Sequence, residues 1–326
     1  MSALVTFRDL IAANRRKSAW LVVGFCVFTT LAILGISLGV IALVAPGALE
    51  YWDWRQTAVL TLLAAAISGM VALLAVYRGD RFLLLASGAQ PIAKADDPQL
   101  YNVVEEVAIA AGIPTPPVYL IDDTAMNAFA TGRDPQHAAI AITRGLREKL
   151  TRDELQGVIA HEIAHIRNYD IRLMMLLAVL IGTVAVLADF FFQMLRFTGR
   201  VRSSSPSGRR RSSAGGGVVA LIVTVIALFL ALLAPLVAQI IQLAVSRQRE
   251  YLADATAVEL TRNPQGILGA LKKLALDTEV LEVANRGTAH MYFVNPIRQY
   301  AARGHSIFAS HPPIQERIRR LEQLLV

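Results

Sequence analysis

Two long uncharged runs constrain this chain more than any other feature of its sequence. Residues 20 to 45 and 57 to 77 contain no Asp, Glu, Lys or Arg over 26 and 21 positions. About 20 consecutive apolar residues are enough to cross the hydrocarbon layer of a bilayer as a helix. A cleaved signal peptide is the alternative for the first run, because Arg15, Arg16 and Lys17 precede it. The apolar core of such a peptide is only about 7 to 15 residues long, so both runs predict transmembrane helices.

The composition agrees with insertion into a membrane. Hydrophobic residues make up 55% of the 326 positions and charged residues only 17%, whereas soluble domains carry about 25% charged residues. Two later runs could also cross: residues 173 to 195 hold one charge, Asp189, and residues 218 to 245 hold none, although Pro235 is expected to kink the second of them. We therefore expect about four transmembrane helices.

The placement of Lys and Arg predicts the orientation. Cytoplasmic loops carry an excess of these residues, which lie before the first run and directly after the second, whereas the connector 46 to 56 holds only Arg55. The N-terminus and the region after residue 78 are thus expected in the cytoplasm. The connector 196 to 217 contradicts this rule if both later runs cross, because it holds six arginines and no acid. Alternatively, these two runs form a hairpin that enters the bilayer without crossing it.

The polar regions predict a small folded part. Residues 98 to 112 place apolar side chains at helical spacing and end at Gly112, which predicts an amphipathic helix. Residues 118 to 121 and 138 to 143 are short β-prone runs on either side of a stretch rich in turn residues, 127 to 136, and predict a small curled sheet. The fold class is mainly α with a small sheet.

A capped helix carries the strongest chemical signal. Thr151 and Glu154 form a capping box, which predicts a helix start. His161 and His165 are four residues apart on one face of that helix, so both imidazoles can bind one metal ion. Glu162 can reach a water molecule at that ion, take its proton and deliver it to a leaving amine. The pattern H-E-x-x-H is the signature of zinc metalloproteases.

A third protein ligand is expected, because catalytic zinc usually has three and keeps one position open. The chain has a single cysteine, Cys26, so His, Asp or Glu must supply this ligand. Glu250 and Asp254 lie four residues apart after the last apolar run, and one could bind the ion while the other orients a liganding imidazole. The alternative for this acidic pair is a solvated helix face without a metal. The alternative for the two histidines is that they only form hydrogen bonds on a solvated helix.

Three motifs in this order resemble one protein family. HEIAH at 161 to 165, SRQREYLADA at 246 to 255 and SHPPIQERIRRL at 310 to 321 are similar to the HtpX-like membrane zinc metalloproteases, relatives of the CAAX prenyl proteases. The resemblance covers essentially the whole chain. It implies a mainly α integral membrane protein with a zincin-like α+β catalytic domain and one zinc ion per chain.

The resemblance also implies a role for each matching residue. The zinc ligands and the general base would be His161, His165, Glu250 and Glu162. Asp254 would support a liganding histidine, and Asn127 would belong to the strand region that binds substrate. His311 and Arg317 would be polar groups near the transition-state oxyanion. Their alternatives are a helix-capping histidine and an arginine that braces a carboxylate.

Both ligand-bearing segments are expected to leave the bilayer on the same side. If the helix of His165 continues into the third run, His165 lies about 12 Å from Leu173, and Glu250 lies about 7.5 Å beyond Val245, at 1.5 Å per residue. The catalytic site is therefore expected in the cytoplasm, close to the membrane. The expected domains are residues 1–77 with two spans, 78–170 and 246–326 as the two catalytic parts, and 171–245 as the hydrophobic hairpin.

The sequence thus predicts a multi-pass membrane endopeptidase, in the inner membrane if the source is bacterial, whose partners are membrane-protein substrates and the lipid bilayer. The resemblance implies a role in stress response and in quality control of damaged membrane proteins. Nucleic acid is not expected as a partner, because the 32 basic residues against 25 acidic ones are explained by cytoplasmic loops. A dedicated processing protease and a catalytically silent metal-binding scaffold are the alternatives. The presence of Glu162 argues against silence.

Overall fold

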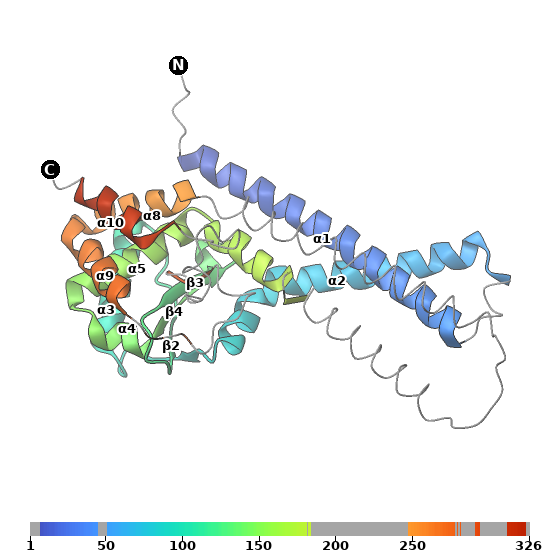
Figure 1. Cartoon of the computed structure of the whole chain (residues 1–326), viewed down its shortest axis with the longest axis horizontal. Coiled ribbons are helices and arrows are strands. Elements are labelled where there is room, and N and C mark those ends of the chain that lie inside the picture. The colour runs from blue at the N-terminus through green and yellow to red at the C-terminus, as the bar shows by residue number, and fades with distance from the viewer. Residues whose placement is uncertain are drawn as a thin grey trace, which may run out of the picture. The chain divides into compact units, whose positions relative to one another are not determined.

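The computed structural model describes residues 7–44, 51–180, 182–183, 247–277, 279, 281, 291–293 and 312–323. The chain, drawn in Figure 1, divides into two units. The first consists of Met1–Ala19, Ala75–Val179 and Ile240–Val326, and the second of Trp20–Leu74 and Leu180–Gln239. The predicted run 218 to 245, most of the run 173 to 195 and His311 lie outside the described residues.

The labelled elements follow one another in this order. They are α1 (Phe7–Val44), α2 (Trp54–Ala86), β1 (Gln90–Pro91), α3 (Pro98–Ala111), β2 (Val118–Ile121), β3 (Ala128–Gly132), the 3-10 helix η2 (Pro135–His137), β4 (Ala138–Thr143), α4 (Arg144–Lys149), α5 (Arg152–Arg167), α8 (Arg247–Thr261), α9 (Pro264–Leu276) and α10 (Ile314–Glu322).

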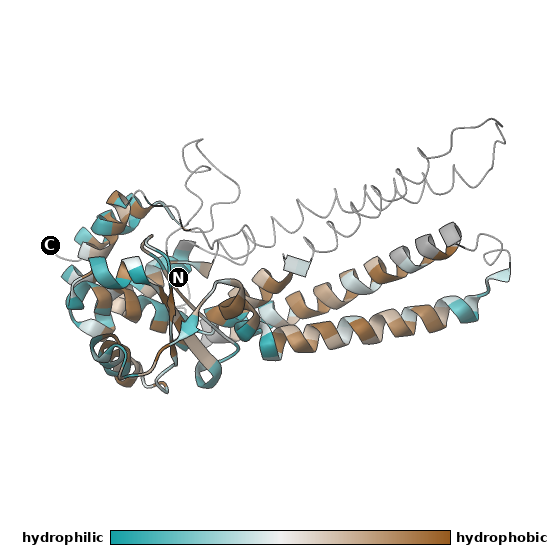
Figure 2. Cartoon of the chain, turned by 90° about the horizontal axis from the view of Figure 1, so that it is seen from below, coloured by the Kyte–Doolittle hydropathy of each residue, from teal (hydrophilic) through white to brown (hydrophobic). Residues whose placement is uncertain are grey.

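Two helices in the described part of the chain are long and apolar enough to cross a bilayer. The candidate spans are Ala12–Gly35 in α1 and Trp54–Ala86, which is all of α2. Apolar residues predominate along both helices (Figure 2). Several hydroxyl groups within them bond to their own backbone, as when Thr29 donates to the Phe25 carbonyl and Ser68 to the Ala64 carbonyl, each at 2.8 Å. This removes the cost of an unsatisfied polar group in lipid.

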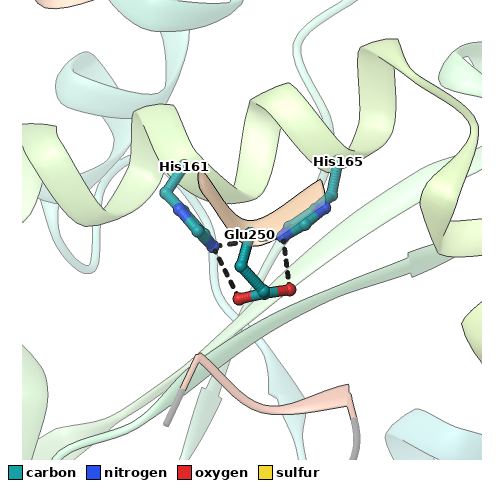
Figure 3. A group of neighbouring side chains, drawn as sticks. All are labelled: His161, His165 and Glu250. Atoms are coloured by element: carbon teal, nitrogen blue, oxygen red, sulfur yellow. Dashed lines mark hydrogen bonds and ion pairs between the residues drawn. The ribbon is translucent and has the colours of Figure 1, made fainter. Parts of the chain in front are cut away.

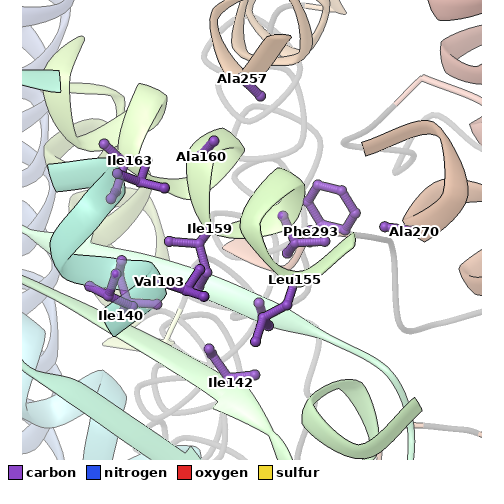
Figure 4. Close-up of a cluster of buried hydrophobic side chains, with 14 of the residues drawn as sticks. Val103, Ile140, Ile142, Leu155, Ile159, Ala160, Ile163, Ala257, Ala270 and Phe293 are labelled. Atoms are coloured by element: carbon purple, nitrogen blue, oxygen red, sulfur yellow. The ribbon is translucent and has the colours of Figure 1, made fainter. Parts of the chain in front are cut away.

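A four-stranded sheet forms the centre of the first unit, in the order β1-β2-β4-β3. β2 pairs with β4 in parallel, and β1 and β3 pair antiparallel to their neighbours. Both faces of the sheet are covered. Ile140 and Ile142 of β4 face the core formed with α3, α5 and α9, part of which is drawn in Figure 4. The intervening Ala141 faces Leu83 and Leu84 of α2 and two methionines of the helix at 170–180.

The composition of residues 127 to 136 does not predict strand β3, although the resemblance implied a strand region at Asn127. The predicted turn stretch 127 to 136 contains Ala, Gly, Asn, Asp and Pro, which are poor strand formers. Its first part is nevertheless strand β3, and all five strand residues are buried. Pairing with β4 and coverage of both faces outweigh the weak propensity of these residues. The strands at Val118–Ile121 and Ala138–Thr143 are confirmed.

Helix α5 begins and packs as its sequence requires. Both hydrogen bonds of the Thr151–Glu154 capping box are present, as predicted. From Leu155 onward α5 is almost entirely buried. Gly157 allows α9 to approach closely, because a methyl group at this position would collide with the backbone of Ile267.

The expectation that the helix of His165 runs straight into the third apolar run is wrong. α5 ends at Arg167, and a turn at Asn168 and Tyr169 separates it from a second helix at 170–180. Tyr169 has a φ of 60°, in the left-handed region that disfavours a bulky residue. Directly after this turn, Asp170 lies against His165.

Candidate metal centre

Two histidines of α5 and one glutamate of α8 meet in the interior of the first unit. His161 and His165 are 1% and 4% exposed, and Glu250 is fully buried. The Nε2 atoms of the histidines are 3.1 Å apart, and the Glu250 carboxylate lies 3.7 Å from His161 and 3.6 Å from His165. Figure 3 shows the glutamate pointing between the two imidazoles. One nitrogen or oxygen atom of each residue thus faces a common point.

These three donors fit a zinc ion. Two zinc–ligand bonds of about 2.0 to 2.1 Å that meet at a tetrahedral angle place the two ligand atoms about 3.3 to 3.4 Å apart. The observed separations of 3.1, 3.6 and 3.7 Å are close to this value. Two imidazoles and a carboxylate are a common donor set for catalytic zinc. The three residues form a group that could hold a metal ion.

The ion pair of Asp254 and Arg317 lies behind His161. Nδ1 of His161 is 2.9 Å from Asp254, so the imidazole can donate to this carboxylate and turn Nε2 toward Glu250. Arg317 of α10 holds the same carboxylate through two hydrogen bonds of 2.6 and 2.9 Å. The guanidinium also donates to the carbonyl of Phe293 and lies over its ring. The position of His161 therefore depends on residues close to the C-terminus.

A second carboxylate lies behind His165. The Nδ1 of His165 is 3.1 Å from Oδ2 of Asp170, and the other oxygen of Asp170 accepts a hydrogen bond of 3.1 Å from Arg249. Arg249 directly precedes Glu250 on α8, so one helix supplies both the third donor and part of this support. Each imidazole thus has a carboxylate on Nδ1, an arrangement that fixes the ring and makes Nε2 a better ligand.

The surroundings shift the pKa values of the two histidines in opposite directions. Burial and the neighbouring charge of Arg317 lower the pKa of His161 to about 4, in spite of Asp254. Burial alone would also lower the pKa of His165. The hydrogen bond to Asp170 and the charge of Glu250 outweigh it and raise this pKa to about 9.

Glu162 lies between the histidines in sequence and faces strand β3. Its side chain is 3% exposed and accepts a hydrogen bond from the backbone N–H of Ala130. Burial raises the pKa of Glu162 to about 7; the charge of His165 opposes this shift, and that of Glu250 adds to it. A carboxyl group with a pKa near neutrality can both accept and donate a proton at physiological pH.

The remaining predicted residues lie in different places. Arg317 and Asp254 are buried directly behind His161. Asn127 is buried just before β3, and its backbone carbonyl accepts from the N–H of Thr143, so this part of it faces β4. His311 lies outside the described residues.

Two contacts of the site were not predicted from the sequence. Asp170 had no assigned role, although an acid three residues before an apolar run could have served as a signal. The contact of the Ala130 N–H with Glu162 could not be found, because residue patterns do not show which backbone group of a strand faces a distant helix.

Comparisons with known proteins give consistent matches. Residues 94–325 match the model of Peptidase family M48. The Protease HtpX homolog of Listeria monocytogenes is 41% identical over 317 residues, covering 97% of this chain and 99% of the relative. The homolog of Levilactobacillus brevis is 38% identical, and the match covers 97% of this chain and 99% of the relative. The homolog of Dictyoglomus turgidum is 39% identical, and the match covers 98% of this chain and 95% of the relative. The crystal structure of S. mikatae Ste24p matches with a TM-score of 0.43 and 20% identity over 88% of this chain, which spans 64% of that protein.

Proposed function

The chain belongs to peptidase family M48 and is a membrane zinc metallopeptidase; from this premise we propose that His161, His165 and Glu250 hold the metal and that Glu162 is the general base. The observation that carries the proposal is the arrangement of the donors. Both Nδ1 atoms face carboxylates, and both Nε2 atoms turn toward Glu250. A solvated histidine pair would not need such support.

The chemistry of the site divides between the ion and the protein. When bound, zinc would supply a Lewis acid that polarises the carbonyl of a peptide bond and lowers the pKa of water. Glu162 takes a proton from the attacking water and passes it to the nitrogen of the leaving amine, so that hydrolysis adds one water across the bond. The N–H of Ala130 fixes the position of this carboxylate. Asp254 and Arg317 position His161, and Asp170 positions His165.

Strand β3 is the proposed location of the substrate, with Asn127 at its start. Among the described residues, β4 lies on one side of β3, and Glu162 bonds to Ala130 of the same strand. An extended peptide next to β3 would therefore lie beside the general base. His311 is proposed to contribute near the oxyanion, together with the charge of Arg317.

The proposed substrates are membrane proteins, cleaved on the cytoplasmic side during quality control. The candidate spans in α1 and α2 support a membrane location for the chain, and the basic flanks favour the cytoplasmic side for the catalytic residues. The runs 173 to 195 and 218 to 245 are proposed as the third and fourth spans, joined by the Arg-rich connector. The proposed domain division is 1–77, 78–170, 171–245 and 246–326.

Substitution of Glu162 by Gln tests the proposed function. E162Q should retain stoichiometric zinc and lose cleavage of a destabilised membrane protein in detergent, because an amide cannot take the proton. Glu106→Gln is the matched control, since Glu106 is exposed and pairs with Arg152 on the surface; this variant should cleave normally. Unchanged cleavage by E162Q would falsify the proposed base. A zinc-loaded wild-type chain without any cleavage would instead favour a silent scaffold.

Two further measurements address the substrate class and topology. A quality-control protease should cleave a destabilised membrane protein faster than its stable parent, whereas a dedicated processing enzyme should not discriminate in this way. A cysteine introduced at 203 to 208, after replacement of Cys26, should react with an impermeant reagent on intact cells if the third and fourth runs cross. Protection of that cysteine would contradict the proposed crossing.

A further inference from the structure

The segment of α1 before its apolar run enters the polar network of the metal centre. Asn14 is 4% exposed, and its amide nitrogen donates to Asp170 at 2.7 Å and to the carbonyl of Asn168 at 3.0 Å. Its amide oxygen accepts from Arg249 at 3.4 Å. Both hydrogens of the amide and its oxygen are thus engaged. A side chain more than 150 positions away in sequence completes the support of His165.

The chemistry of Asn14 suits a position between opposite charges. It lies against the carboxylate of Asp170 and the guanidinium of Arg249, and the carboxylate uses a separate oxygen for His165. An amide donates to the first group and accepts from the second, so it satisfies both without adding a charge. Leucine has a similar size but can do neither.

A neighbouring contact holds the turn that carries Asp170. The guanidinium of Arg15 lies over the ring of Tyr169, 4.5 Å from its centroid. Tyr169 is the residue with the left-handed backbone, a conformation that persists only where its surroundings maintain it. α1 therefore contacts the turn at Asn168, Tyr169 and Asp170 in succession.

We propose that Asn14 is a positioning residue of the metal centre, which acts through Asp170 to orient His165 for zinc. The N-terminal segment of α1 is then a part of the zinc site as well as the start of a candidate membrane span. This inference rests on the proposed function, because it takes His165 as a metal ligand. Loss of the Asn14 amide leaves the Asp170 carboxylate less constrained, and the imidazole that it holds becomes less well oriented.

The test measures zinc affinity of the full-length protein in detergent, by competition with a chromophoric chelator. N14L should bind zinc several-fold more weakly, up to about the 10-fold loss expected when the outer support of a liganding histidine is itself removed. Arg16→Ala is the matched control, because Arg16 is an exposed neighbour on the same helix, and its zinc affinity should be unchanged. Asn14→Ser keeps a small polar group and serves if N14L does not fold; it should also weaken zinc binding.

A double-mutant comparison separates positioning from a general loss of stability. In a D170N background the effect of N14L should fall below twofold, because the carboxylate through which Asn14 acts has been removed. An equal loss of affinity in both backgrounds would overturn the inference. So would wild-type zinc affinity in N14L and N14S. A wild-type chain that takes up no zinc would overturn the proposed function and this inference with it.

Discussion

His161 and His165 lie one turn apart on α5, but the rest of the protein supports them in different ways. His161 faces Asp254, a carboxylate that Arg317 of α10 holds with two hydrogen bonds. His165 faces Asp170, which shares its other oxygen between one guanidinium nitrogen from α8 and a neutral amide from α1. One histidine thus depends on a segment near the C-terminus and the other on a segment near the N-terminus.

The difference lies in where the cation is placed. The guanidinium of Arg317 is 3.3 Å from Nδ1 of His161, so it contacts the imidazole as well as the carboxylate. Arg249 bonds to the oxygen of Asp170 that faces away from His165. Burial and the charge of Arg317 together lower the pKa of His161 to about 4, whereas the hydrogen bond to Asp170 and the charge of Glu250 raise the pKa of His165 to about 9.

The largest expected effect comes from removing the cation behind His161. Arg317→Met should lower the free energy of unfolding by about 3 to 5 kcal/mol, because it leaves a buried carboxylate without its charged partner. Arg249→Met should cost less, about 1 to 3 kcal/mol, since Asp170 keeps the Asn14 amide. Unfolding of both metal-free variants in detergent measures the two losses. Equal losses would show that the two supports are equivalent after all.

The effects of the two carboxylates, Asp254 and Asp170, on zinc affinity should differ less than the effects of the two arginines on stability. Asp254→Asn should weaken zinc binding about 100-fold and Asp170→Asn about 10-fold, the two ends of the usual range for such supports. The first is larger because an amide cannot neutralise Arg317, whose charge then faces His161 and the ion. Chelator competition provides the measurement. A greater loss in D170N would reverse the assigned order.

A variant away from the centre should change stability alone. Asp97 caps α3 by accepting from the Leu100 N–H and also pairs with Arg147. Asp97→Ala should cost about 1 kcal/mol and leave zinc affinity unchanged. Burial would raise the pKa of Asp97, but the bonds from Arg147 and Leu100 outweigh it and lower the pKa. The contribution of Asp97 to the free energy of unfolding is therefore present above the unfolded pKa of about 3.9 and is lost as the pH falls through the lower pKa of the folded state. D97A should lack this loss of stability at acid pH.

The smallest expected effect is a release of protons when zinc binds. At pH 7.5 the metal-free His165 holds a proton, because its pKa is about 9, whereas His161 is already neutral. A liganding imidazole must be neutral, so His165 should release about one proton and His161 none. Calorimetry of zinc uptake in buffers of different ionisation enthalpy counts these protons. D170N should release fewer, since the pKa of His165 falls when the carboxylate is removed; an unchanged count would contradict the comparison.

Local patterns were sufficient for the features that involve neighbouring residues. The uncharged runs predicted the long apolar helices α1 and α2, and the spacing of apolar residues predicted α3. The capping box predicted the start of α5, and the four-residue spacing of His161 and His165 placed both on one helical face. In each case the information lies within one helix.

The outer supports of the metal centre could not be predicted in this way. Asn14 and Arg249 are 235 positions apart, and nothing in either neighbourhood indicates that they meet. Strand β3 has the composition of a turn and exists because β4 and two covering layers of helices bury it. The turn at Tyr169 interrupts a helix that periodicity alone would continue.

The sequence by itself determined the apolar helices and the His-Glu-x-x-His pair, because hydrophobic length and helical spacing are properties of adjacent residues. The tertiary structure decided which charge stands behind each histidine. That choice depends on distant segments packing into one buried site, where the low dielectric makes each neighbouring charge count, and it gives two identical side chains on the same helix opposite shifts in pKa.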